Sequence, residues 1–128
     1  MIYQYNKLVR DNIPSSINSI KGRKATWRKL DENEYINELN KKLIEEAHEF
    51  IEENSIEELA DLMEVVENIM RVKNINWESV KDAQNVKRSK KGSFLNRVYL
   101  EYVEEDEKNE EEEKELNKEW RKRLGKKD

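Results

Sequence analysis

The sequence predicts an all-α helical bundle of about four helices, and three observations support that prediction. First, apolar residues recur at steps of three and four along residues 32–53, the spacing of one helix face, at Ile36, Leu39, Leu43, Ala47 and Phe50. Second, Asp31 and Glu34 have the spacing of a capping box. Third, residues 55–73 are apolar on more than one face, which is typical of a helix buried in a bundle or an oligomer interface.

The flanking segments predict smaller elements. Asp11 as a cap and Pro14 in the first turn predict a short helix that buries Ile13, Ile17 and Ile20 and stops at Gly22. Residues 23–30 have weak strand character around Thr26 and Trp27. Trp27 is either a core anchor or a residue that stacks on a base, and we expect the core because aromatic side chains dominate core energetics.

The second half of the chain predicts a third long helix and a charged tail. Asn76 is its expected cap and Gly92 its C-cap, and its expected buried face is Trp77, Val80, Ala83 and Val86. Residues 98–102 alternate as in a brief strand, so we expect a minor β-ribbon beside the helices. We expect a domain over 1–103 and a solvated, charged tail or helix over 104–128.

Composition limits the classes of function. Only 35% of residues are hydrophobic and 42% are charged, so we expect a homodimer or homotetramer to complete the core. There are no cysteines, which excludes thiolate metal sites. No apolar run approaches a membrane span and no signal peptide is visible, so we expect a soluble, cytoplasmic protein without a membrane partner. The net charge of −4 argues against a nucleic-acid partner.

Two acidic pairs carry the candidate chemistry. Glu46 and Glu49 are three residues apart, as are Glu58 and Asp61. Residues at this spacing are neighbours on a helix surface, and the link of Asn54 and Ser55 is short enough to make the two helices antiparallel neighbours. Four carboxylates could then surround a small volume, where they need a counter-charge or raised pKa values. Mg²⁺ fits best, with Mn²⁺ as an alternative, and either points to phosphate chemistry.

A simpler explanation stays open on spacing alone. In a chain so rich in charge, acidic pairs three residues apart also arise by chance as solvated side chains. Ser55 and Glu58 have the spacing of a capping box, in which Glu58 would bond back to the Ser55 N–H.

The acidic pattern resembles a known family. Glu46-x-x-Glu49 followed by Glu58-x-x-Asp61, with similar flanks, resembles the signature of the MazG superfamily, the all-α nucleoside triphosphate pyrophosphohydrolases. The stretches 5–14 and 90–94, together with Arg97, resemble the phosphoribosyl-ATP pyrophosphohydrolase-like branch. The resemblance covers about residues 3–103 and leaves out the tail.

The resemblance implies a Mg²⁺-dependent enzyme that converts a nucleoside triphosphate, or a nucleotide like phosphoribosyl-ATP, to the monophosphate and pyrophosphate. The metal ligands that it implies are Glu46, Glu49, Glu58 and Asp61. A carboxylate such as Glu45 or Glu49 would orient the attacking water, which makes Glu45, Glu46 and Glu49 the candidate catalytic residues. The candidate substrate-binding residues are Lys7, Arg10, Lys87, Lys91, Phe94 and Arg97.

Two other functions remain open. Glu45-x-x-His48 is a motif of di-iron and di-manganese carboxylate bundles, but those sites need two such motifs and the chain has one histidine. A symmetric dimer would supply the second motif. The other alternative is a non-catalytic helical module that binds a nucleotide or a protein partner.

Overall fold

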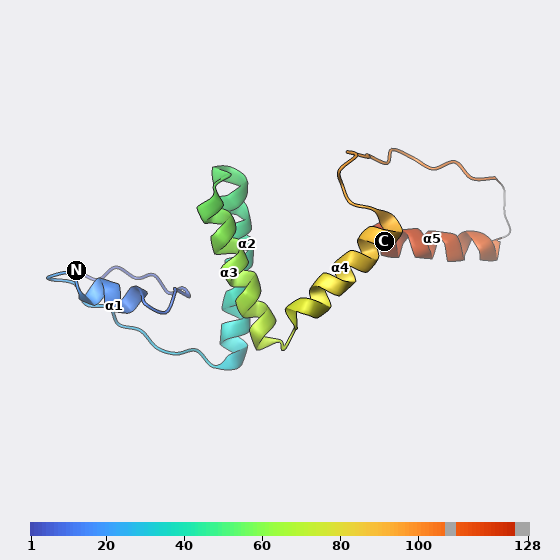
Figure 1. Ribbon diagram of the computed structural model, residues 1–128. Coiled ribbons are helices and arrows are strands. Elements are labelled where there is room, and N and C mark those ends of the chain that lie inside the picture. Colours follow the sequence, from blue (N-terminus) through green and yellow to red (C-terminus); the bar gives the residue numbers. More distant parts are fainter. Residues whose placement is uncertain (107–109, 125–128) are drawn as a thin grey trace. The chain divides into compact units, whose positions relative to one another are not determined.

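The computed structural model describes residues 1–106 and 110–124, and all regular secondary structure within them is helical (Figure 1). The helices are α1 (Ile13–Asn18), α2 (Glu32–Glu53), α3 (Ile56–Val72), α4 (Trp77–Lys91) and α5 (Glu110–Leu124). The predicted all-α class is therefore confirmed. The predicted β-ribbon is wrong for the described residues, since neither 23–30 nor 98–102 forms a strand. Short alternating runs need a strand partner, and neither run has one there.

The chain falls into two compact units, Met1–Gly92 and Ser93–Asp128. The first holds α1 to α4 and the second holds α5. The predicted division into 1–103 and 104–128 was drawn from the end of the family resemblance, and it stays a prediction.

The start of α2 is fixed by side chains close in sequence. The Asp31 carboxylate accepts a hydrogen bond from the Glu34 N–H, and the Glu34 carboxylate accepts one from the Asp31 N–H, which completes the predicted capping box. Arg28 donates two hydrogen bonds to Glu34. These bonds, those from Arg28 foremost, lower the pKa of Glu34 to about 2. The first turn of α2 is thus stabilised by hydrogen bonds among Arg28, Asp31 and Glu34.

The link between α2 and α3 reverses the chain within two residues. Asn54 has a left-handed backbone with φ of 52° and donates its N–H to the Phe50 carbonyl, which ends α2. Ser55 then caps α3 by accepting a hydrogen bond from the Glu58 N–H. The two helices pack against each other side by side as an antiparallel pair (Figure 1). This hairpin is the most extensive helix–helix contact in the described part of the chain.

The core of the hairpin is small. Leu39 is the one buried hydrophobic residue among those described, at 3% exposed. The other members of the predicted α2 stripe are half-buried: Ile36, Leu43, Ala47 and Phe50. The apolar residues of α3 between Leu62 and Met70 are half-buried as well. The stripe is therefore confirmed as the face that α2 turns toward α3, although a single chain covers it only in part.

The predicted ends of α4 are confirmed, and its predicted buried face is wrong. Asn76 caps the helix by accepting from the Glu78 N–H, and Gly92, with φ of 84°, follows its last residue. The four residues expected to be buried are all exposed: Trp77, Val80, Ala83 and Val86. The pattern identified an apolar stripe, but no helix among the described residues packs extensively against it.

The N-terminal expectations need similar correction. Pro14 lies in the first turn of α1 as predicted, but the residue before the helix is Asn12, and no side-chain hydrogen bond caps it. Asp11 is therefore not the cap. Ile13 and Ile20 are exposed, Ile17 is half-buried, and Trp27 is 62% exposed rather than in the core. A helix as short as α1 presents too little surface to bury these side chains.

None of the described helices is both long enough and apolar enough to span a bilayer.

The capping box of α2 gives a testable contrast between two aspartates. Asp31→Ala should lower the free energy of unfolding by about 1 kcal/mol, because the Glu34 N–H loses its acceptor. Asp11→Ala should change it by less than about 0.5 kcal/mol, since Asp11 does not cap α1. Urea denaturation followed by circular dichroism would measure both. Equal losses in the two variants would contradict the assignment of the caps.

Candidate metal centre

The acidic cluster begins with Glu46 on α2. Glu46 is 9% exposed and is the one buried charged residue among those described. It lies at the edge of the apolar stripe, between Leu43 and Ala47 along the helix, so the packing of α3 covers it. Lys42, one turn earlier, places its Nζ 3.9 Å from Glu46 Oε1. Burying the charged form of a carboxylate with only one distant counter-charge is unfavourable in free energy, so Glu46 needs a further positive charge near it.

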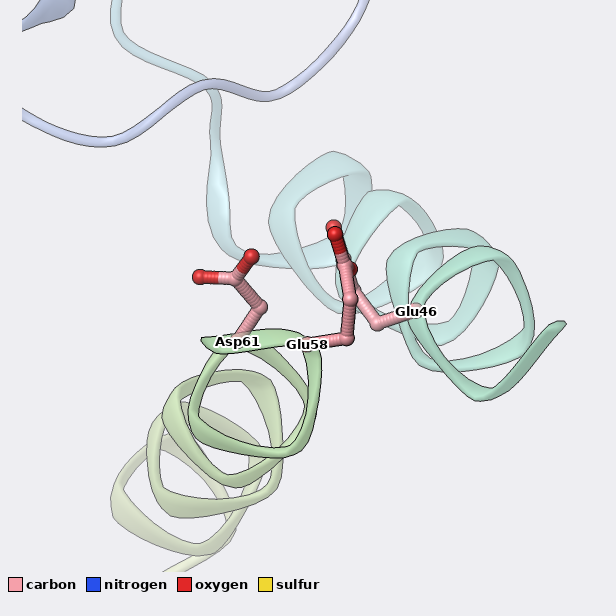
Figure 2. A group of neighbouring side chains, drawn as sticks. All are labelled: Glu46, Glu58 and Asp61. Carbon is pink, nitrogen blue, oxygen red and sulfur yellow. The ribbon is translucent and has the colours of Figure 1, made fainter. Parts of the chain in front are cut away.

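Glu58 and Asp61 reach the same place from the first turns of α3. The cap at Ser55 starts the helix so that both side chains project from the same side of α3, with Glu58 directed toward Glu46 of α2 (Figure 2). A carboxylate oxygen from each of Glu46, Glu58 and Asp61 lies within 4.8 Å of the others. Three oxygens at this separation could hold a metal ion, and oxygen ligands are those preferred by hard divalent cations.

The electrostatics of the cluster are unfavourable without a cation. Burial raises the pKa of Glu46 above its ordinary value of 4.5, and the neighbouring Glu49 and Asp61 raise it further. Lys42 opposes this shift. Burial also raises the pKa of Glu58, again with Glu49 and Asp61 as further causes. Both shifts have the sign expected where like charges converge out of water.

Two oxygens of the cluster are buried and have no hydrogen-bond partner, namely Oε2 of Glu46 and Oε2 of Glu58. Buried polar atoms in folded proteins are nearly always paired, so an orphaned one calls for an explanation such as an ion. The capping alternative is realised only in part, because Ser55 accepts from the Glu58 N–H but the Glu58 Oε2 stays unpaired. The donor set and the two orphaned atoms therefore fit a bound cation.

Glu49 lies beside the cluster. Its carboxyl lies close enough to those of Glu46 and Glu58 to help raise the pKa of both. It does not belong to the set whose oxygens all lie within 4.8 Å of one another. Of the four predicted ligands, the structure thus brings three together and leaves Glu49 adjacent.

Two predicted phosphate-binding residues meet the acids from the N-terminal segment. Arg10 Nη2 donates a hydrogen bond to Asp61 Oδ1 at 2.6 Å. Lys7 Nζ lies 3.6 Å from Glu45 Oε1. Glu45 also pairs with Lys42 at 3.6 Å. The segment before α1 therefore contacts both helices of the hairpin at the acidic cluster.

The remaining predicted site residues are exposed. Lys87 and Lys91 lie in the second half of α4, while Phe94 and Arg97 belong to the other compact unit. Phe94 is 95% exposed. Their part in substrate binding stays a prediction. His48 is exposed and lies outside the acidic cluster.

Sequence reasoning overlooked Lys42 as a functional residue. Its side chain is 18% exposed and lies within 4 Å of carboxylate oxygens of both Glu45 and Glu46. The available signal was its position three and four residues before these two acids, the spacing of ion pairs along a helix. Lys42 is the closest cation to the most buried member of the cluster.

Fold and site together define an all-α chain with an acidic triad that could bind a metal ion. Comparison with protein-family models, with curated proteins and with solved structures returns no significant match.

The raised pKa values predict how stability depends on pH without divalent cations. A carboxyl whose folded-state pKa is raised contributes stability below its unfolded pKa, and that stability is lost as pH rises through the folded pKa. Glu46→Gln should therefore melt at a higher temperature than wild type at pH 7 in EDTA. The difference should shrink as pH falls toward 4.5, the ordinary value for Glu46.

Glu38→Gln is the matched control, since Glu38 also lies on α2 but pairs with Lys41 outside the cluster. It removes the same charge and should not reproduce the gain. Thermal melts at several pH values would measure both variants. A Glu46→Gln protein that is less stable than wild type at pH 7 in EDTA would contradict the unfavourable electrostatics.

Proposed function

We propose that the protein is a Mg²⁺-dependent nucleotide pyrophosphohydrolase of the MazG type, with Mn²⁺ as an alternative ion. Its reaction would convert a nucleoside triphosphate, or a nucleotide like phosphoribosyl-ATP, to the monophosphate and pyrophosphate. The observation that carries the proposal is the pair of buried, unpartnered oxygens, Glu46 Oε2 and Glu58 Oε2. Both residues belong to a cluster that Asp61 completes, and the order and spacing of these acids resemble the superfamily's signature.

The proposed ligands are Glu46, Glu58 and Asp61, whose oxygens lie within 4.8 Å of one another. A bound Mg²⁺ would neutralise charge on phosphate oxygens and lower the pKa of a bound water. The cluster is well suited to this role because its carboxylates lack enough protein counter-charge of their own. Lys42 is the nearest cation to Glu46, and its Nζ lies 3.9 Å away.

Glu49 is the better of the two candidates for orienting the attacking water. Glu45 is engaged by Lys7 and Lys42, each 3.6 Å away, so its carboxylate is occupied by two cations. Glu49 instead borders Glu46 and Glu58 and lies outside the triad of mutually close oxygens. A carboxylate beside the ligands can accept a hydrogen bond from water as the anhydride bond between the α and β phosphates breaks.

The phosphates would meet Lys7 and Arg10 first. Both side chains already lie at the acids, and Arg offers a planar fork that matches phosphate oxygens. Lys87, Lys91, Phe94 and Arg97 remain the further substrate contacts implied by the resemblance. All four side chains are exposed.

Self-association into a homodimer or homotetramer would complete the core. Leu39 is the one buried hydrophobic residue among those described, while Ile44, Ile51 and Ile56 on the hairpin are more than 60% exposed. Large exposed apolar side chains on one hairpin suit an interaction surface. A second copy of the hairpin would cover it as one half of a helical bundle covers the other.

The activity is tested by pyrophosphate release from a panel of nucleotides with Mg²⁺. Glu46→Gln and Asp61→Asn should each lower turnover by at least about a hundredfold, because each removes a charged ligand. Glu38→Gln should keep wild-type turnover, since Glu38 pairs with Lys41 outside the cluster.

Wild-type turnover in Glu46→Gln or Asp61→Asn would reject the ligand assignment. Nucleotide binding by wild-type protein without pyrophosphate release would instead favour a non-catalytic binding module.

The association is tested by sedimentation equilibrium across a range of concentrations. We expect a mass at least twice the 15.5 kDa of the chain. Replacing the exposed Ile44 and Ile51 with Lys should shift the protein toward monomer, because charges would then be buried at the contact. A monomeric wild-type protein at all concentrations would contradict the association.

A further inference from the structure

Within residues 1–106 and 110–124, the contact of Arg10 with Asp61 is the one place where a positive side chain donates a hydrogen bond to a proposed metal ligand. Arg10 Nη2 lies 2.6 Å from Asp61 Oδ1, and 51 residues separate the two in sequence. Lys42, by comparison, stays 3.9 Å from Glu46. Arg10 is thus the closest counter-charge to any carboxylate of the triad.

Arg10 and a cation on Asp61 are in conflict. Mg²⁺ binds carboxylate oxygens at about 2.0–2.1 Å, so an ion on Oδ1 would lie within about 4.7 Å of Arg10 Nη2. The two positive charges repel each other at that distance. Either the cation binds less tightly or the guanidinium leaves.

The ion pair of Arg10 with Asp61 is exposed to solvent and therefore weak. The side chains of Arg10 and Asp61 are 59% and 40% exposed, and ion pairs in that environment contribute little to stability. Arg10 stands before α1 in a segment without regular secondary structure. The other ion pair of this segment, Lys7 with Glu45, spans 3.6 Å between side chains that are also well exposed. Releasing Arg10 therefore disturbs no packed element.

We propose that Arg10 and the divalent cation exchange at Asp61. This inference rests on the proposed function. Without the cation, the guanidinium neutralises Asp61; when the cation binds, Arg10 is released and its fork becomes available to a phosphate oxygen of the substrate. Arg10 thereby couples the two binding events, because the same charge that weakens cation binding alone strengthens triphosphate binding once the cation is present.

The alternative role for Arg10 is to hold Asp61 in the orientation that binds the cation. An arginine that only orients a metal ligand raises the affinity of the site, and its loss weakens metal binding. The two roles predict opposite changes in the affinity for the cation alone when Arg10 is replaced: an increase if the two exchange, and a decrease if Arg10 supports the ligand.

The test is isothermal titration calorimetry of the full chain with MnCl₂ at fixed ionic strength, and then with inorganic triphosphate at saturating Mn²⁺. Arg10→Gln should bind Mn²⁺ alone more tightly, on the order of three- to tenfold, because a repelling charge is gone. It should bind triphosphate more weakly, on the order of tenfold, because the fork is gone. Arg10→Lys keeps the charge, so it should restore wild-type Mn²⁺ affinity but only part of the triphosphate affinity.

Arg28→Gln is the matched control. Arg28 forms a comparable exposed ion pair with Glu34, at 2.9 Å, outside the acidic cluster. It removes the same charge and should leave both affinities unchanged, which separates the exchange from a general effect of net charge. Circular dichroism would verify that each variant is folded.

The outcomes separate the exchange from the proposed function. If wild type binds Mn²⁺ and Arg10→Gln binds it equally or more weakly, the exchange is rejected and the metal site stands. If wild type binds no Mn²⁺, the metal site fails, and the exchange fails with it.

Discussion

The mutual repulsion of the carboxylates between α2 and α3 is the constraint on which the rest of the structure depends. The packing that covers Leu39 also draws Glu46 under α3, where Glu58 and Asp61 meet it. Apolar burial thus brings like charges together, and the raised pKa values of Glu46 and Glu58 reflect the unfavourable free energy of their charged forms. Two lysines and an arginine offset part of that charge from the rim, but two buried oxygens remain unpaired.

Features that depend on neighbours in sequence could be predicted. The caps Asp31, Ser55 and Asn76 each act on a backbone N–H two or three residues away, so spacing alone located the starts of three helices. Gly92 marked the end of α4 for the same reason. The convergence of Glu46 with Glu58 and Asp61 could also be predicted, because a two-residue link constrains the helices to lie side by side.

Features that depend on what packs against an element could not be predicted. The apolar stripe of α4 and the side chain of Trp27 have the composition of core residues, yet both are exposed. Composition does not reveal whether the chain has a surface that packs against such residues. Glu49 shares the spacing of the metal-ligand motif, but the rotation of α2 against α3 sets it beside the triad. The contact of Arg10 with Asp61 spans 51 residues and left no local signal.

The short link between α2 and α3 has a consequence for the order in which the molecule assembles. The carboxylates of the triad lie close together in sequence, whereas Arg10 must find Asp61 across a much longer loop. The entropy cost of closing a loop grows with its length, and local contacts form fastest. We therefore expect the hairpin to gather its negative charges before the arginine docks, so that a cation in solution would encounter the nascent cluster earlier than Arg10 does.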